Sequence, residues 1–147
     1  MREEFMQPQA AECGAECKAL GGLAGSSRDR SEPLLHPGNT NCGGCGMSVV
    51  LNLMTHAIGD TPVQMAIPAC CGIVAAGPYP YSNYGCPVFA TTFASAAAAA
   101  AGMAEVARMN GERTRVIAFA GDGGTYDIGM ATLSGAAERN DDVLFLC

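Results

Sequence analysis

The sequence predicts an α/β fold in which a mainly parallel sheet carries helices on both faces. Two apolar runs, residues 63–67 and 115–120, are typical of buried strands. Stretches with the apolar spacing of helices alternate with them, and glycine-rich residues 121–129 lie where a strand would turn into a helix. This βαβαβ order requires crossover connections, and crossovers place the strands parallel in one sheet.

The first helix is expected to begin near Gly46 and to end at Gly59 and Asp60. Its buried face is predicted from apolar residues at helical spacing, namely Val49, Val50, Leu53, Met54 and Ala57. The strand at residues 63–67 follows. Its carboxyl end delivers Cys70 to the crevice where open α/β sheets hold their ligands.

The second half of the chain repeats the alternation. Residues 78–87 are predicted to form a loop, because tyrosines, prolines and a glycine crowd into them. The alanine-rich residues 92–110 are predicted to form a helix whose small side chains let another helix or a cofactor pack closely. After the strand at residues 115–120, a last helix is indicated by Met130, Leu133, Ala136 and Ala137, and an apolar strand ends at Cys147.

Residues 1–40 are predicted to be a polar leader or arm, because glycines, serines and alternating charges interrupt them. We expect this arm to wrap a partner or stay mobile, with Cys13 and Cys17 as spare thiols. Residues 41–147 are predicted to form the N-terminal part of an α/β domain. An apolar strand is an unusual place for a fold to finish, so the chain is expected to be a fragment.

Residues 121–129 read Gly-Asp-Gly-Gly-Thr-Tyr-Asp-Ile-Gly and form the most informative motif. Gly121, Gly123 and Gly124 permit positive φ angles and let a ligand approach the backbone, while the first amides of the following helix are free donors. The Asp122 carboxylate would repel a bare phosphate but is a natural ligand for Mg²⁺ bridging diphosphate oxygens. The motif therefore predicts a cation-assisted diphosphate site. The alternative is a tight turn in which Asp122 only caps the helix.

The cysteines form a second group of candidate site residues, as metal ligands. Cys42 and Cys45 are three positions apart with two glycines between them, which is the local geometry of a zinc knuckle or of one corner of an iron-sulfur site. Cys70 or Cys71 is the expected third ligand, and the fourth stays open. Cys13, Cys17, Cys86 and Cys147 are candidates by residue type, although Cys86 and Cys147 are expected to be small buried apolar side chains.

Composition narrows the class of protein further. The hydrophobic content of 49 % is enough for a core, and the formal net charge of −6 without a basic run argues against nucleic-acid binding. The chain opens without a cationic and then apolar signal, so its eight cysteines predict a reducing cytoplasm rather than a disulfide framework. The longest small-apolar stretch is shorter than the roughly 20 residues that cross a bilayer. No membrane span is expected.

These motifs together resemble the β-subunit of 2-oxoacid:ferredoxin oxidoreductases, most closely its pyruvate-type branch. The resemblance covers the chain from about residue 41 to its end. It rests on Cys42-Gly43-Gly44-Cys45-Gly46, on Cys70, on Pro78-Tyr79-Pro80-Tyr81, and on residues 121–129 with their continuation through residues 133–140. It implies a thiamine diphosphate-binding fold that is incomplete in this chain. It also implies conversion of a 2-oxoacid and coenzyme A to acyl-CoA, carbon dioxide and reduced ferredoxin.

The resemblance implies thiamine diphosphate, Mg²⁺ and a 4Fe-4S cluster as cofactors. Cys42, Cys45 and Cys70 are then the expected cluster ligands, with Cys71 as a neighbour, and Asp122 is the expected Mg²⁺ ligand beside the diphosphate-binding Gly121, Gly123 and Gly124. A second Mg²⁺ ligand and the fourth cluster cysteine are expected beyond residue 147. No catalytic residue is expected here, because the glutamate that activates the aminopyrimidine belongs to the α-subunit. That α-subunit, γ-type and ferredoxin-like subunits, and ferredoxin are the expected partners.

Two departures from the family concern the substrate. Met47 and Ala94 stand where the family often carries acidic residues. These changes predict a substrate pocket with a smaller and less charged lining. We expect such a pocket to suit an aromatic or otherwise unusual 2-oxoacid as readily as pyruvate. Two other functions stay open: a zinc-knuckle interaction module, and a non-oxidative thiamine diphosphate-dependent decarboxylase or synthase.

Overall fold

A computed structural model describes residues 32–76 and 82–147 of the chain. Within them it contains a four-stranded parallel sheet with the strand order β2-β1-β3-β4. The strands are β1 (Val63–Pro68), β2 (Val88–Thr91), β3 (Arg115–Phe119) and β4 (Leu144–Leu146). The predicted parallel sheet is confirmed.

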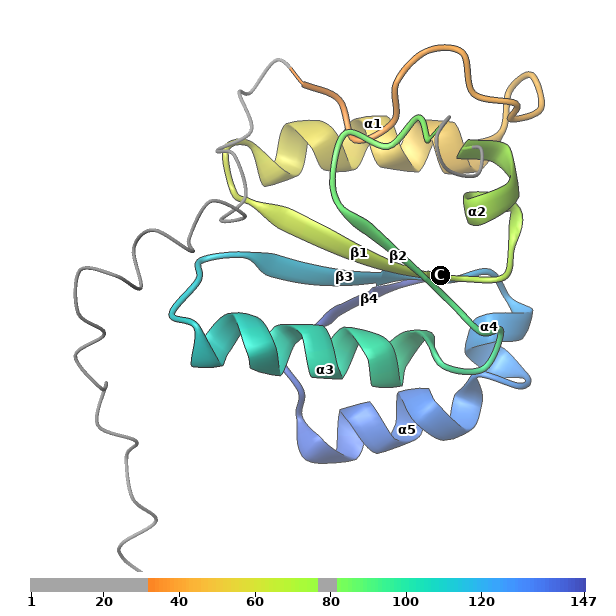
Figure 1. Ribbon diagram of the computed structural model, residues 1–147. Helices are drawn as coiled ribbons and strands as arrows, with labels where there is room; N and C mark the ends of the chain where they lie inside the picture. The colour runs from red at the N-terminus through yellow and green to blue at the C-terminus, as the bar shows by residue number, and fades with distance from the viewer. Residues whose placement is uncertain (1–31, 77–81) are drawn as a thin grey trace, which may run out of the picture.

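Helices cover both faces of this sheet (Figure 1). α1 (Gly46–Ile58) and α2 (Cys71–Ala76) lie over one face, and α3 (Ala96–Met109) and α5 (Met130–Arg139) lie over the other. The single turn α4 (Gly123–Tyr126) lies at the end of the sheet, beyond β3. The predicted α/β fold with helices on both faces is therefore confirmed. Within the described residues, no helix is long and apolar enough to span a membrane.

Side chains alternate across the sheet and divide the core into two layers, because successive strand residues point to opposite faces. Met65, Ile67 and Ile117 pack with Leu51 of α1 in one cluster. The other cluster is built of smaller residues: Ala66, Val116 and Ala118 of the strands meet Ala100 of α3. The alanine-rich sequence predicted that another helix or a cofactor could pack closely against this helix. In the structure, the small side chains let α3 pack closely on the sheet.

The predicted buried face of α1 is right for Met54 and wrong for Val49 and Leu53, because the helix is rotated about its axis relative to the prediction. Leu51 is fully buried and Met47, Met54 and Ile58 pack against the core, whereas Val49 is 54 % and Leu53 64 % exposed. Apolar residues occupy two overlapping helical registers in this segment, so periodicity alone admits both faces. Tertiary packing selects the one centred on Leu51.

Two missed elements and two boundaries also differ from expectation. β2 was missed, because a four-residue edge strand after Pro87 carries little periodic signal. The short helix α2 was also missed, and α3 begins at Ala96 rather than at residue 92. Leu34 and Leu35 belong to the core although they lie in the stretch predicted as a leader, so the packed chain begins before residue 41. Cys13, Cys17 and residues 78–81 lie outside the described residues.

The strand order creates a crevice between β1 and β3. The chain leaves β1 towards α2 on one face, and it leaves β3 through α4 towards α5 on the other (Figure 1). Neighbouring parallel strands whose connections diverge in this way open a crevice at their carboxyl ends, where α/β proteins bind ligands. Cys70 follows β1 and Gly121 follows β3, so the sequence motifs converge on this crevice.

Candidate functional site at the carboxyl edge of the sheet

A hollow of about 500 Å³ occupies the crevice. Its wall combines the start of α1, the turn after β1, the loop before α3, the turn after β3 and the residue after β4. Cys70, Gly121, Asp122 and Gly123 all line it. The structure thus brings the predicted diphosphate motif and one predicted metal-ligating thiol to the same edge of the sheet.

The glycines of the turn after β3 provide space rather than unusual backbone angles. Positive φ angles among the glycines are found only at Gly38, Gly44, Gly59 and Gly111 of the described residues, so that part of the prediction is wrong. A Cβ on Gly123 would lie 2.7 Å from the Phe93 ring, and one on Gly124 would lie 3.3 Å from Pro68. A Cβ on Gly121 would lie 3.6 Å from the Cys70 Cβ. The turn is glycine-rich because β1 and the Phe93 loop press against it.

Asp122 presents a carboxylate from a fixed backbone. Its carbonyl accepts hydrogen bonds from the backbone N–H groups of Thr125 at 3.1 Å and Tyr126 at 2.7 Å. Its exposed side chain makes no capping hydrogen bond to α4. The structure therefore does not show the alternative in which Asp122 only caps a helix. A carboxylate without a protein partner within the described residues remains available as a hard oxygen ligand.

The backbone amides of this turn are also available. Within residues 32–76 and 82–147, the N–H groups of Asp122, Gly123 and Gly124 donate no hydrogen bond. Backbone donors beside a carboxylate that can hold a cation form a donor set that suits a diphosphate bound together with Mg²⁺. The residues present therefore fit that part of the predicted cofactor site.

The turn does not lead directly into a long helix, as the sequence suggested. α4 ends at Tyr126, and α5 begins only at Met130. Between them Gly129 is buried, and a Cβ there would collide with the carbonyl group of Gly124. Gly129 therefore lets the chain fold back on the turn. Sequence periodicity could not reveal this break, because the apolar spacing continues through it.

Cys42 and Cys45 form the predicted local turn. The Cys45 N–H donates to the Cys42 carbonyl at 3.0 Å, and Gly44 has a φ of 75°. That angle suits the third residue of a tight turn and favours glycine. Cys42 is exposed and Cys45 half-buried, and the next residues, Gly46 and Met47, already line the hollow. The pair thus lies at the start of α1, near the carboxyl edge.

Cys70 is half-buried and, like Cys86 and Tyr84, packs against the margin of the core. The Tyr84 hydroxyl donates to the Gly72 carbonyl at 2.7 Å, directly after the cysteine pair. Burial raises the pKa of Tyr84 well above its usual value, and the negative charges of Cys70 and Cys86 in their thiolate forms raise it further. Cys86 is thus half-buried against the core, in line with its expected structural role.

The structure does not gather Cys42, Cys45 and Cys70 into one metal site. Among the described residues, no three Cys, His, Asp or Glu side chains lie together as metal ligands. The described residues therefore do not by themselves form an iron-sulfur or zinc centre. The cluster ligands remain a prediction from the sequence.

Other residues of the wall were assigned differently by sequence reasoning. Cys147 was expected to be a small buried side chain, but it is exposed and lines the hollow. Its position after β4, the neighbour of β3, is the signal that could have placed it there. Cys71 is an exposed neighbour of Cys70, as expected, and Met47 and Phe93 add apolar surface.

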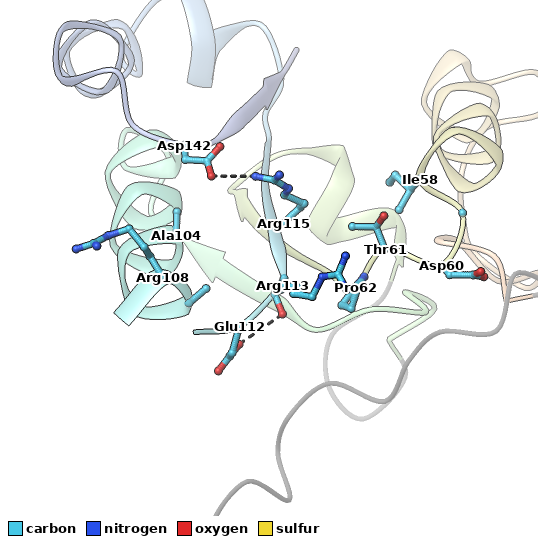
Figure 2. Close-up of a pocket in the computed structure, with 13 residues that line it drawn as sticks. Ile58, Asp60, Thr61, Pro62, Ala104, Arg108, Glu112, Arg113, Arg115 and Asp142 are labelled. Carbon is cyan, nitrogen blue, oxygen red and sulfur yellow. Dashed lines mark hydrogen bonds and ion pairs between the residues drawn. The ribbon is translucent and has the colours of Figure 1, made fainter. Parts of the chain in front are cut away.

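A larger hollow of about 870 Å³ lies at the opposite edge, beside the amino ends of β1 and β3. Arg113, Arg115 and Asp142 belong to its wall, and Figure 2 shows the ion pair of Arg115 with Asp142, 2.9 Å apart. Both side chains of that pair are mostly exposed, and no cysteine or glycine-rich turn reaches this hollow. The larger hollow therefore contains none of the residues that the sequence predicted for the site.

Comparison with known families gives the site its context. Residues 69–147 match the family model of the thiamine pyrophosphate enzyme, C-terminal TPP binding domain. The chain belongs to this thiamine pyrophosphate enzyme family. Thiamine pyrophosphate and thiamine diphosphate are two names for one compound. The matched segment contains Cys70, the glycine-rich turn and Cys147, which all line the hollow at the carboxyl edge.

Individual relatives extend the similarity to the start of α1 and beyond. The chain is 38 % identical over 117 residues to pyruvate synthase subunit PorB of Methanothermobacter marburgensis, which covers 79 % of the chain and 40 % of that protein. It is 36 % identical over 121 residues to ketoisovalerate oxidoreductase subunit VorB of Pyrococcus furiosus, covering 78 % of the chain and 39 % of that protein. The chain spans about two fifths of the length of these relatives.

Proposed function

We propose that this chain is part of the β-subunit of a 2-oxoacid:acceptor oxidoreductase that forms an acyl-CoA by oxidative decarboxylation. The observation that carries the proposal is the shared hollow, in which the unpartnered Asp122 carboxylate and the free amides of its turn lie beside Cys70. The names of the relatives, a pyruvate synthase subunit and a ketoisovalerate oxidoreductase subunit, support the same reaction class.

The chain's own residues would hold the cofactor in a simple way. Asp122 would ligate Mg²⁺, and the amides of Gly123 and Gly124 would donate to the diphosphate oxygens. Phe93 and Met47 would exclude water from the remainder of the hollow. Thiamine diphosphate held there would supply the carbanion and electron-sink chemistry that decarboxylation of a 2-oxoacid needs. No side chain of this chain takes a covalent role.

The remaining partners belong to the same proposal. A 4Fe-4S cluster would use Cys42, Cys45 and Cys70 with a fourth ligand from elsewhere, and it would pass electrons to ferredoxin or a similar acceptor. An α-subunit, a γ-type subunit and a ferredoxin-like subunit would complete the complex with the 2-oxoacid and coenzyme A. We place this complex in the cytoplasm, because cysteines that bind metal rather than pair as disulfides are typical of reducing compartments.

The central test replaces Asp122 by Asn in the chain purified with the subunits that accompany it. Asp122→Asn keeps the size of the side chain but removes the charge that a Mg²⁺ ion needs. We expect thiamine diphosphate, measured in the denatured eluate, to fall at least tenfold, about 1.4 kcal/mol of binding free energy. Asp127→Asn is the matched control, since Asp127 is an exposed carboxylate five residues further along the same loop. Full retention by Asp122→Asn would refute the assignment.

Metal analysis of the same preparation separates the other functions. Iron and acid-labile sulfide that fall by the content of one 4Fe-4S cluster per chain in Cys42→Ser, Cys45→Ser and Cys70→Ser, but keep the parent level in Cys71→Ser, are the expected result. Zinc without sulfide would identify a zinc-knuckle interaction module instead. Thiamine diphosphate without iron would identify a non-oxidative decarboxylase or synthase.

A further inference from the structure

We infer that Thr125 is a positioning residue for the Mg²⁺-diphosphate site, an inference that rests on the proposed function. Thr125 is 3 % exposed and is the one polar residue among the described residues that is buried to this degree. Its hydroxyl donates to the Gly121 carbonyl at 2.7 Å. A buried hydroxyl needs a partner, and this one uses the carbonyl directly before Asp122.

The bond fixes the peptide from which Asp122 projects. A trans peptide points its N–H opposite to its C=O, so holding the Gly121 carbonyl on Thr125 directs the Asp122 N–H away from α4. The Asp122 carbonyl is held as well, by the N–H groups of Thr125 and Tyr126. Both peptides that flank Asp122 are therefore anchored, while its carboxylate stays free.

This arrangement lowers the entropic cost of binding. A ligand site is most effective when its donor atoms are already held in place before the ligand arrives. Without the hydroxyl, the Gly121 carbonyl would lose its hydrogen bond and the Gly121-Asp122 peptide would sample other orientations. The carboxylate and the adjacent amides would then have to be ordered when Mg²⁺ and the diphosphate bind.

The test compares Thr125→Val with the parent in the complex as purified and stripped of cofactor. Valine keeps the shape of threonine and replaces the hydroxyl by a methyl group, which cannot donate to the Gly121 carbonyl. We expect the Kd for thiamine diphosphate at saturating MgCl₂, measured by titration calorimetry, to rise about tenfold. If Thr125→Val does not fold, Thr125→Ser and Thr125→Ala form a second pair that differs only in the hydroxyl. We expect the serine variant to bind like the parent and the alanine variant about tenfold more weakly.

Thr55→Val is the matched control for stability. The Thr55 hydroxyl also donates to a carbonyl four residues earlier, that of Leu51, at 2.9 Å, but α1 holds it away from the hollow. We expect Thr55→Val to lower the Tm and leave the Kd unchanged. A Thr125→Val protein with a lower Tm and the parent's Kd would reduce Thr125 to a structural residue. If the parent binds no thiamine diphosphate, the proposed function fails and this inference fails with it.

Discussion

At the scale of single residues, the absence of a side chain at Gly129 lets the loop after β3 close. Its Cβ position coincides with the Gly124 carbonyl group and lies 3.0 Å from the Gly124 Cα. These are backbone atoms of a buried turn, so they cannot move aside as a flexible side chain could. We expect Gly129→Ala to reduce the free energy of unfolding by about 3 kcal/mol, as strong overpacking does. Urea denaturation followed by circular dichroism measures it.

The control for this substitution is Gly102→Ala in the middle of α3. A Cβ there meets no atom within 4 Å, and the residue is helical. Replacing a helical glycine by alanine removes backbone freedom from the unfolded chain and stabilises by about 0.5 to 1 kcal/mol. Equal urea midpoints for Gly129→Ala and the parent would show that the turn rearranges easily. The structural account of the loop would then be wrong.

At the scale of elements, Tyr84 fastens three segments around Cys70. Its backbone forms an isolated bridge with Leu35, and its hydroxyl holds Gly72 in α2. Leu34 is tied in turn to α1 through its N–H and the Thr55 hydroxyl, 2.9 Å apart. The backbone of Tyr84 therefore holds residues 33–36, and its phenol holds α2 beside the predicted cluster ligand.

Replacing Tyr84 by Phe tests this connection and its pH dependence. At pH 7 we expect a loss of about 1 kcal/mol for the hydrogen bond to Gly72. The folded state keeps the Tyr84 pKa above its unfolded value of about 10, chiefly through burial. This stabilisation is complete below pH 10 and declines above it, because the unfolded chain releases the proton first. The parent should therefore lose its advantage over Tyr84→Phe as the pH rises above 10.

Urea midpoints of both proteins between pH 7 and pH 11 measure this difference. A constant difference between the parent and Tyr84→Phe across this range would contradict the raised pKa.

Most elements with a clear apolar pattern lie where the sequence placed them, and these include the three-residue β4. β1, β3 and α5 lie where the apolar pattern placed them, because each is long enough or buried enough to show its period. β2 and α2 are short, and their formation depends on pairing with β1 and packing beside it, which local sequence does not encode. The buried face of α1 was lost for the same reason, since only tertiary contacts distinguish its two apolar registers.

At the scale of the whole molecule, topology explains why part of the site was predictable. Parallel strands end at the same edge, so a motif after β3 and a thiol after β1 had to meet there once the sheet was recognised. Cys147 reaches the same hollow through β4. Side-chain exposure and the distances between Cys70 and the Cys42-Cys45 turn depend on how α1 is seated. That placement follows from the whole core and not from the spacing of the cysteines.

The two edges of the sheet offer a direct test of where the cofactor binds. Phe93→Ala removes a ring that lies against Gly123 at the carboxyl edge, and we expect the Kd for thiamine diphosphate to rise about tenfold, or 1.4 kcal/mol. Arg115→Ala breaks the exposed pair with Asp142 at the other edge. Pairs of this kind stabilise by less than about 1 kcal/mol, so stability should change little. The Kd for thiamine diphosphate should stay within about twofold of the parent. Salt screens the interaction between one distant exposed charge and a ligand at the carboxyl edge.

Arg113→Ala extends this test to a second arginine of the larger hollow. Arg113 has no ion pair within the described residues, whereas Arg108 in the same wall is paired with Glu105. Titration calorimetry with thiamine diphosphate and MgCl₂ on the complex compares all three variants under one set of conditions. A Kd that responds to Arg113 and Arg115 but not to Phe93 would move the cofactor to the amino edge. Because the Asp122 carboxylate and the free amides of its turn lie at the carboxyl edge, that result would separate the ligand from every donor assigned to it. The opposite response ties the cofactor to the crevice between β1 and β3.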